Sequence, residues 1–377
     1  MSDVLVKPGT TIGMIGGGQL GRMMAQSAKQ MGYRIAVLEP THDSPCAQVA
    51  DHVIEAKYDD LDGAAKLAEL SDVITYEFEN IDESTAKWLT EHVDFPQGFD
   101  VLRVSQHRLT EKRTIESLGV TVAPYAEVSS LSDIQSACET VGLPAVLKTC
   151  RGGYDGKGQA VVHTFEELEK AATELAQAGE LVLEGWISFQ SEVSVIVTRS
   201  RNGETSTFPV AENIHKNNIL HQSIVPARIS EGTAEEARAI ALKLAEGLEV
   251  VGTLAVEMFV QEDGHILVNE IAPRPHNSGH YTIEACRTSQ FEQQIRAVCG
   301  LPLGSTELLR PVVMENVLGE DIKPLYEKLH LLGDISLHLY GKAEAKEKRK
   351  MGHLTVLADT VETALNQLEQ FKKEATN

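Results

Sequence analysis

Two glutamates, Glu257 and Glu270, are spaced so that they could hold a metal ion between them. Each lies in an apolar, strand-like run, and the dipeptide Asp263–Gly264 between the runs is typical of a two-residue type I′ hairpin turn. With that turn, Glu262 pairs with His265, and counting back along both strands sets Glu257 opposite Glu270. Facing carboxylates repel each other, whereas Mg²⁺ prefers oxygen ligands of this kind. The pattern predicts a Mg²⁺ site, and two exposed surface acids are the alternative.

A glycine-rich loop precedes this pair in the chain, within the sequence LKTCRGGYDGKGQAVV (Leu147–Val162). Strand-like runs flank the loop, Lys148 ends the first run, and Lys157 lies inside the loop. The loop is not a Walker A motif, because no Gly-Lys in it is followed by Ser or Thr. Glycines allow close approach of the backbone to a ligand and wide φ/ψ freedom. We therefore expect a flap that covers phosphates, with a flexible hairpin carrying solvated lysines as the alternative.

A second glycine-rich turn lies near the N-terminus, between a predicted strand and a predicted helix. It has the pattern Gly16-x-Gly18-x-x-Gly21, and Glu39 closes the next strand 18 residues after Gly21. Taken alone, the pattern matches the dinucleotide fingerprint, with an acid placed for a ribose. A bare turn at a helix N-terminus also suits any phosphate. A dinucleotide, a phosphate monoester and a plain tight turn all remain open for this motif.

Directly after Glu270, the segment IAPRPHNSGHY carries Arg274, His276 and Asn277 on an irregular, proline-rich loop. An arginine at this place could clamp an oxyanion beside a transferring phosphate. The alternative is a rigid loop whose polar groups cap one another.

The elements that must position these residues change in character along the chain. In the first hundred residues strands and helices alternate, which predicts a parallel sheet. The predicted elements there are strands at Thr11–Ile15, Ile35–Leu38 and Val73–Tyr76, a helix at Gly21–Met31, and a further helix from near Ser105 to Gly119. Short strands with glycine turns follow, at Ala145–Lys148, Gln159–Val162, Leu181–Glu184, Glu192–Val197, Thr253–Val260 and His265–Glu270, with a helix at about Thr233–Gly247. Two last strands are expected near Leu337 and Leu354, before a helix from about Val361.

Composition excludes several classes of protein. The chain has 377 residues, 42% of them hydrophobic and 24% charged, which predicts a folded protein of two or three domains. Its net charge of −21 disfavours non-specific binding to nucleic acid or to an anionic membrane. The five cysteines form no C-x-x-C pair, and neither a signal peptide nor a membrane span is evident. We expect a cytoplasmic protein that binds neither nucleic acid nor membrane.

Taken together, the motifs resemble those of a known family. A lysine-bearing strand, a glycine-rich flap and paired metal acids occur in the order of an ATP-grasp enzyme. The match is closer still to the 5-(carboxyamino)imidazole ribonucleotide synthases, the ATP-dependent carboxylases of bacterial purine synthesis. The similar segments are GGGQLGRM, TYEFENI, GGYDGKGQ, NEIAPRPHNSGH and RKMGHL, and they span Gly16 to Leu354 in the expected order.

The resemblance implies an α/β and α+β fold in three parts. These are a Rossmann-like (pre-ATP-grasp) domain at 1–104, an ATP-grasp domain at 105–303 with a flap subdomain at about 119–185, and a small C-terminal domain at 304–377. It also implies that the Gly16–Gly21 turn holds the ribonucleotide substrate, not NAD.

The resemblance further implies which residues bind ATP and metal. The loop 153–159 would cover the phosphates, the segment 184–187 would edge the adenine mainly through backbone groups, and Glu192 would bind the ribose. The implied metal is Mg²⁺ (or Mn²⁺), held by Glu257 and Glu270. The full ATP-binding set is Arg108, Lys148, Gly153, Tyr154, Asp155, Gly156, Lys157, Gly158, Gln159, Glu184, Gly185, Trp186, Ile187, Glu192, His215, Asn269 and Glu270.

The other implied partners are bicarbonate and 5-aminoimidazole ribonucleotide, and a homodimer is expected. The implied catalytic residues are Arg274, His276 and Asp155. The implied substrate-binding residues are Gly18, Gln19, Leu20, Glu77, Tyr154, Arg274, Asn277, Arg349 and Lys350. Cys150 departs from the family pattern, because we expect a larger, often basic residue at this position. We assign no role to Cys150.

Three rival functions remain open from the sequence. A different ATP-grasp ligase, such as one that uses formate, would share the central motifs. An NAD-dependent dehydrogenase would leave the paired acids unexplained, and a silent nucleotide-binding regulator would lack them.

Overall fold

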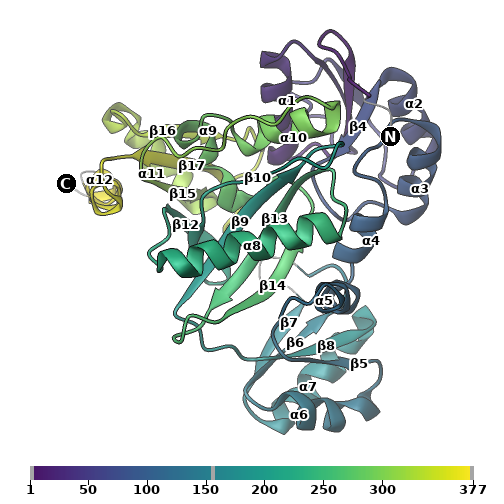
Figure 1. Cartoon of the computed structure of the whole chain (residues 1–377), viewed down its shortest axis with the longest axis vertical. Coiled ribbons are helices and arrows are strands. Elements are labelled where there is room, and N and C mark those ends of the chain that lie inside the picture. The colour runs from purple at the N-terminus through teal and green to yellow at the C-terminus, as the bar shows by residue number, and fades with distance from the viewer. Residues whose placement is uncertain (1–3, 154–157, 374–377) are drawn as a thin grey trace.

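The N-terminal part of the chain is a parallel sheet flanked by helices (Figure 1). The computed structural model describes residues 4–153 and 158–373. The sheet has the strand order β3-β2-β1-β4. Its elements are β1 (Thr11–Ile15), α1 (Gln19–Gln30), β2 (Arg34–Leu38), β3 (His52–Ile54), α2 (Leu61–Leu70), β4 (Val73–Tyr76), α3 (Glu83–His92) and α4 (Asp100–Ser105).

The register of this sheet places the carboxyl ends of β1, β2 and β4 at the same level. Ile15 pairs with both Leu38 and Tyr76, so Gly16, Glu39 and Glu77 leave the sheet side by side. Loops at the carboxyl ends of parallel strands form the binding edge of such sheets. The predicted parallel sheet is confirmed, and β1 and β4 have the predicted bounds.

A small antiparallel lobe follows, at the bottom of Figure 1, with the strand order β5-β8-β6-β7. Lys148 pairs with Gln159, so the glycine-rich loop is the connection of the β6–β7 hairpin, as predicted. Apolar side chains of the strands and of α6 and α7 share one core. The elements are α5 (Arg108–Ser117), β5 (Tyr125–Val128), α6 (Ile134–Val141), β6 (Ala145–Thr149), β7 (Gln159–Val162), α7 (Phe165–Leu175) and β8 (Leu181–Gly185).

The helix predicted from near Ser105 to Gly119 is α5, which begins at Arg108, whereas Ser105 is the last residue of the separate helix α4. His107 caps α5, since its Nδ1 accepts the N–H of Thr110 at 3.5 Å. The predicted end is confirmed, because Gly119 has a φ of +68°, which favours glycine.

A nine-stranded sheet forms the centre of the molecule. α8 packs against β9 and β13, and α10 packs against α1 of the N-terminal part (Figure 1). The central elements are β9 (Ser191–Arg199), β10 (Thr205–Thr207), β11 (Ala211–Lys216), β12 (Ile219–Val225), α8 (Glu231–Gly247), β13 (Gly252–Val260), β14 (Ile266–Ala272), α9 (Thr282–Ala285) and α10 (Gln290–Cys299).

The C-terminal part extends this central sheet, because β15 pairs with β12 and carries β17 and β16 beyond it. Its elements are β15 (Val312–Leu318), α11 (Ile322–Glu327), β16 (Ser336–Leu339), β17 (Lys350–Leu357) and α12 (Val361–Lys373). Across the described ranges, no helix has the length and apolar character needed to cross a membrane.

The hairpin of β13 and β14 differs from the predicted one in two places. Gln261, not Glu262, closes the loop with His265, so the loop has three residues and Gly264 takes a φ of +84°. Three-residue loops that end in a left-handed glycine are a common hairpin type. The predicted two-residue turn is therefore wrong.

A β-bulge then corrects the register. Met258 pairs with Val268 and Glu257 with Glu270, which leaves Asn269 as the extra residue. The predicted pairing of the two glutamates is confirmed, because the bulge cancels the error in the turn.

Candidate active site

Glu257 and Glu270 are the centre of a cluster of acids on β13, β14 and α5. Glu111 on α5 is buried beside them and accepts the backbone N–H of Ile271 at 3.1 Å. Burial, and next the charge of Glu270, raises the pKa of Glu257 to about 8. The same two causes raise the pKa of Glu111 to about 8. The cluster therefore carries more negative charge than its surroundings stabilise.

Few cations offset this charge. Arg108 Nη1 lies 3.1 Å from Glu270 Oε2. His276 Nε2 lies 3.5 Å from Glu257 Oε1, but burial lowers the pKa of His276 well below its usual value, so this neutral ring adds no positive charge. Lys350 at the start of β17 acts on Glu257 electrostatically and lowers its pKa. Two facing carboxylates, of which Glu257 has a charged form that burial penalises, fit a divalent cation, which supplies the missing positive charge.

A second charged group joins β6, β8 and α5. Lys148 Nζ lies 2.8 Å from Glu184 Oε2, and Lys112 Nζ lies 3.2 Å from Glu184 Oε1. Burial alone would raise the pKa of Glu184, but Lys148 and Lys112 outweigh it and lower the pKa to about 2. Because both carboxylate oxygens contact lysines, Glu184 can contact a ligand mainly through its backbone groups.

The backbone after Glu184 has both used and unused hydrogen-bonding groups. The N–H of Gly185 donates to Pro124 O at 2.8 Å, and that of Trp186 donates to Pro144 O at 3.1 Å. No hydrogen bond between described residues involves the N–H of Ile187. The ring of Trp186 is half exposed.

Glu192 and His215 meet across β9 and β11. Glu192 Oε2 lies 2.6 Å from His215 Nδ1. Burial lowers the pKa of His215, but the contact with Glu192 outweighs it and the pKa is raised. The two residues predicted for the nucleotide thus form a polar pair, and the charge of His215 also acts on Glu257.

In the N-terminal domain the glycine turn is bound by carboxylates of the chain itself. Glu77 accepts the N–H of Gly21 at 2.7 Å and also that of Gly18. Glu39 accepts the N–H of Gly17 at 2.8 Å. Burial raises the pKa of Glu77, although the two N–H groups counteract it. The N–H groups of Gln19 and Leu20, at the start of α1, make no hydrogen bond among the described residues.

The loop after β14 is tied down by polar pairs. Arg274 Nε and Nη2 contact the two carboxylate oxygens of Glu79 at 2.5 and 3.2 Å. Asn277 exchanges two side-chain hydrogen bonds with Asn316, at 2.9 and 2.7 Å. Burial, and next Arg274, lowers the pKa of His276 well below its usual value, so its ring is neutral at pH 7.

The remaining predicted residues belong to the glycine-rich loop and to the segment before β17. Tyr154, Asp155, Gly156 and Lys157 lie outside the described residues. Gly153 O accepts Arg108 Nη2 at 3.4 Å, and Gly158 has a φ of +69°. Arg349 is exposed, and its Nη1 donates to Glu344 O at 3.0 Å.

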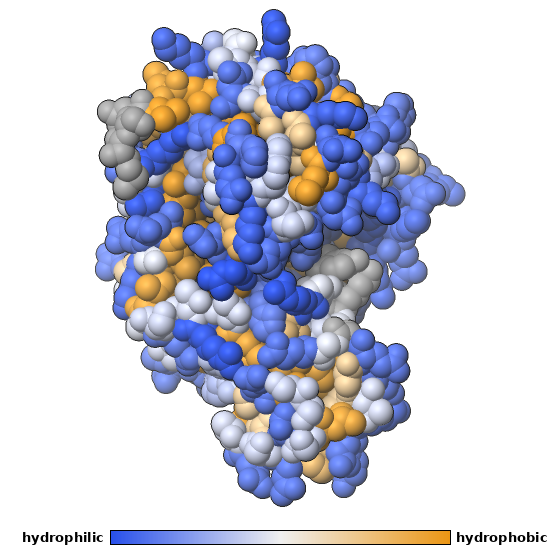
Figure 2. Space-filling view, turned by 90° about the vertical axis from the view of Figure 1, so that its right-hand side faces the viewer, coloured by the Kyte–Doolittle hydropathy of each residue, from blue (hydrophilic) through white to orange (hydrophobic). Residues whose placement is uncertain are grey.

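A cavity of about 780 Å³ opens between the N-terminal domain and the lobe. Its lining includes Tyr58 and Asn80 on one side and Arg151 and Gly152 on the other. Figure 2 shows that face of the molecule, which is hollowed above the lobe and carries mostly hydrophilic side chains there. The first residues after β6, Arg151 and Gly152, therefore face this cavity.

Sequence reasoning missed four charged or polar members of the site, namely Glu79, Glu111, Lys112 and Asn316. Glu111 and Lys112 follow Arg108 by one helical turn, so helical spacing from a predicted site residue was a usable signal. Glu79 lies within the TYEFENI segment, whereas no pattern marked Asn316.

Three family models match successive parts of the chain. They are the ribonucleotide synthetase preATP-grasp domain at residues 9–106, the ATP-grasp domain at 113–291, and the phosphoribosylaminoimidazole carboxylase C-terminal domain at 312–367.

Close relatives cover the chain almost completely. N5-carboxyaminoimidazole ribonucleotide synthase of Bacillus subtilis is 58% identical, over 95% of this chain and 94% of its own. A solved ADP complex of an N5-carboxyaminoimidazole ribonucleotide synthetase is 57% identical with a TM-score of 0.95, and covers 97% of both chains. The Aspergillus clavatus enzyme, solved with ADP and 5-aminoimidazole ribonucleotide, is 30% identical with a TM-score of 0.90, over 97% of this chain and 98% of its own.

Proposed function

The chain belongs to the N5-carboxyaminoimidazole ribonucleotide synthase family of ATP-grasp enzymes, and we propose that it catalyses the reaction for which its relatives are named. In this reaction 5-aminoimidazole ribonucleotide is carboxylated on its exocyclic amine, with ATP and bicarbonate consumed, as a step of purine biosynthesis. The observation that carries the proposal is the partly buried, facing pair of Glu257 and Glu270. Arg108 contacts Glu270, the charge of His215 acts on Glu257, and His276 of the Arg274 loop contacts Glu257.

We assign the nucleotide to the side of the cluster that faces the lobe. Lys148 and Arg108 would contact its phosphates, the N–H of Ile187 would meet the adenine, and Glu192 would bind the ribose. Glu257 and Glu270 would hold Mg²⁺, with Asn269 beside them at the bulge. Bound there, the ion would offset phosphate charge, because phosphoryl transfer is catalysed mainly by positioning and electrostatics.

We assign the carboxylation to the Arg274 loop. A bicarbonate oxygen attacks the γ-phosphorus, ADP leaves, and the carboxyphosphate formed breaks down to CO₂ and phosphate. The substrate amine then forms a C–N bond to CO₂ and loses a proton. Arg274 would hold the oxyanions through its fork, in exchange for or beside its contact with Glu79. Neutral His276 and Asp155 are the candidates for taking the proton.

We assign the ribonucleotide phosphate to the start of α1. The unbonded N–H groups of Gln19 and Leu20 and the helix N-terminus favour an anion there. Glu77 accepts the N–H groups of Gly18 and Gly21, so it would hold the shape of the turn. The phosphate would then bind to the N–H groups of Gln19 and Leu20. Lys350 and Arg349 would approach the same substrate from β17, and Asn277 would act through its pair with Asn316.

The family resemblance also leads us to propose that the protein works in the cytoplasm as a homodimer, with Mg²⁺ (or Mn²⁺) as its metal ion. Light scattering of the purified protein and metal titrations of its activity test the last two points.

The test of the function is ADP release with and without bicarbonate and 5-aminoimidazole ribonucleotide. We expect turnover only when both are present, together with an acid-labile carboxylated product labelled from ¹⁴C-bicarbonate. Turnover with formate in place of bicarbonate would instead identify a different ATP-grasp ligase. Glu270→Gln should remove turnover in either case, and Glu262→Gln on the exposed hairpin loop is its matched control.

A further inference from the structure

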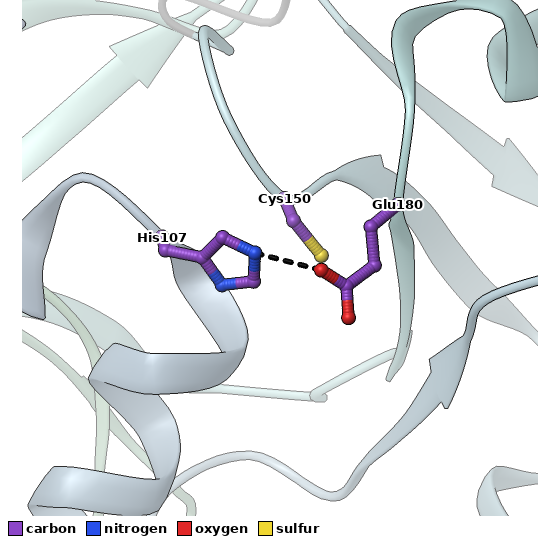
Figure 3. Close-up of side chains that lie close together, drawn as sticks. All are labelled: His107, Cys150 and Glu180. Carbon is purple, nitrogen blue, oxygen red and sulfur yellow. Dashed lines mark hydrogen bonds and ion pairs between the residues drawn. The ribbon is translucent and has the colours of Figure 1, made fainter.

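We propose that His107, Cys150 and Glu180 form a binding site for one Zn²⁺ ion at the base of the β6–β7 hairpin. The proposal goes beyond the carboxylase function, in which these three residues have no part. Figure 3 shows the three side chains converging, with the sulfur of Cys150 directed toward the Glu180 carboxylate and the His107 ring on the other side.

The three residues come from separate segments that the backbone holds together. His107 caps α5, Cys150 directly follows β6, and Glu180 directly precedes β8. The N–H of Arg108 donates to Cys150 O at 3.0 Å, and the N–H of Cys150 donates to Glu180 O at 2.9 Å. The ligand atoms are therefore placed by main-chain geometry and need little ordering when a metal binds.

The distances and donor types suit zinc. Each residue offers one ligand atom, and these atoms all lie within 4.8 Å of one another, with His107 Nε2 at 2.8 Å from Glu180 Oε2. Tetrahedral Zn²⁺ with its usual bond lengths sets such ligands roughly 3.3–3.6 Å apart, so small side-chain rotations suffice. Sulfur and imidazole nitrogen select Zn²⁺ over Mg²⁺, which takes oxygen ligands.

The site also has a route to solvent. Cys150 is 2% exposed, but the side chain of Glu180 is 36% exposed. Glu180 lines a cavity of about 350 Å³ together with Ser129, Ser130 and Gly179. An ion can enter on this side, and water can fill the fourth coordination position.

A second group of possible ligands, Glu284, His338 and His353, is a poorer candidate. The rings of His338 and His353 stack at 4.6 Å with an angle of 15° between their planes. The nitrogen lone pairs of nearly parallel rings do not converge on one ion. This cluster serves as an internal control.

Binding has a defined proton balance. A Zn–S bond forms as the Cys150 thiol loses its proton to solvent. Zn–N and Zn–O bonds replace the contact between His107 and Glu180. The ring proton of neutral His107 moves from Nε2 to Nδ1, so His107 gives up the long hydrogen bond of 3.5 Å that Nδ1 accepts from the Thr110 N–H. Affinity should therefore rise about tenfold per pH unit while the thiol is protonated in the free protein.

The test uses the full-length protein without a histidine tag, stripped of metals and held in millimolar Mg²⁺ to occupy carboxylate sites. Co²⁺ is titrated first, because a thiolate ligand gives a charge-transfer absorption in the near ultraviolet that a carboxylate site lacks. Zn²⁺ is then added as a competitor. We expect one equivalent of Co²⁺ with this absorption, displaced by one equivalent of Zn²⁺.

The variants separate this site from other thiols and histidines. Cys150→Ser should abolish the absorption, and His107→Asn, which keeps a good helix cap, should weaken Zn²⁺ binding at least tenfold. Cys138→Ser and His338→Asn should change neither. No thiolate absorption in the wild type, or its persistence in Cys150→Ser, would overturn the proposal. Loss of binding in Cys138→Ser alone would assign the ion to that partly exposed cysteine and would overturn it too.

Discussion

Glu257→Gln should stabilise the protein without ligands and at the same time remove its activity. The wild-type carboxyl has a pKa of about 8 in the folded state, against 4.5 for an ordinary glutamate, because of burial and of Glu270. The folded protein therefore holds a proton that the unfolded chain has lost. This group's share of the stability is fully present below about pH 4.5 and is lost as the pH rises toward 8.

The size of the effect follows from the same values. Each pH unit between the two pKa values costs the folded state about 1.4 kcal/mol. At pH 7 the free energy of unfolding of the wild type is thus lower by about 3 kcal/mol, a loss that Glu257→Gln does not suffer. Glu111, whose pKa is also about 8, remains in the variant and leaves it a similar pH dependence of its own. The stability of the variant should therefore still fall with rising pH, but less steeply than that of the wild type.

The assay is thermal unfolding of the ligand-free protein from pH 5 to pH 8.5, with turnover measured in parallel. Wild type and Glu257→Gln should coincide near pH 5 and separate as the pH rises. Turnover should fall at least about 100-fold, or about 2.7 kcal/mol in the barrier, because the substitution would remove a proposed ligand of Mg²⁺. Glu262→Gln is the control and should match the wild type in both. Equal slopes for all three proteins would refute the buried repulsion, and normal turnover at low Mg²⁺ would refute the metal assignment.

Three further outcomes are expected. Arg274→Lys keeps the charge but loses the planar fork, so bicarbonate-dependent turnover should fall about 10- to 150-fold, while the ATP affinity measured by calorimetry stays unchanged. Weak ATP binding with normal turnover at saturating ATP would instead assign Arg274 to the nucleotide. Gly158→Ala should impair ATP kinetics, because its φ is +69° and its Cβ would lie 2.7 Å from Thr149 Oγ1; Gly98→Ala, with a φ of +64° and open space around it, controls for strain alone. NAD should show no binding by calorimetry, because carboxylates of the chain already hold three N–H groups of the glycine turn; micromolar affinity would revive the dehydrogenase.

Most strands could be predicted from the sequence because they are apolar runs bounded by glycine or polar residues. β1, β4 and β7 have the predicted bounds. The Glu257–Glu270 pairing was predicted through a two-residue turn that does not exist, and it holds because the bulge at Asn269 adds one residue to β14. Bulges depend on packing against the neighbouring strand, so hairpin counting alone could not supply this correction.

Side-chain partners were much less predictable than strands. Glu184 meets Lys112, and Arg274 meets Glu79, only because the fold brings distant segments together. A charged residue on a helix such as Lys112 looks like a surface residue in the sequence, although it is 2% exposed in the structure. Burial of charge is a tertiary property, and the pattern of apolar residues gives no hint of it here.

The pairing of charges explains why the acid cluster should be selective for a cation. Arg274, Lys148 and His215 each contact a carboxylate of the chain, so these cations enter the site already compensated. Glu257 and Glu111 differ, because burial and Glu270 both penalise their charged forms. A divalent ion bound there would relieve that penalty, so we expect the repulsion between the carboxylates to strengthen its binding. Bicarbonate, which we assign to Arg274, would find no such deficit and would have to exchange with Glu79 or bind beside its contact with Arg274. We therefore expect metal and nucleotide to bind first and bicarbonate second.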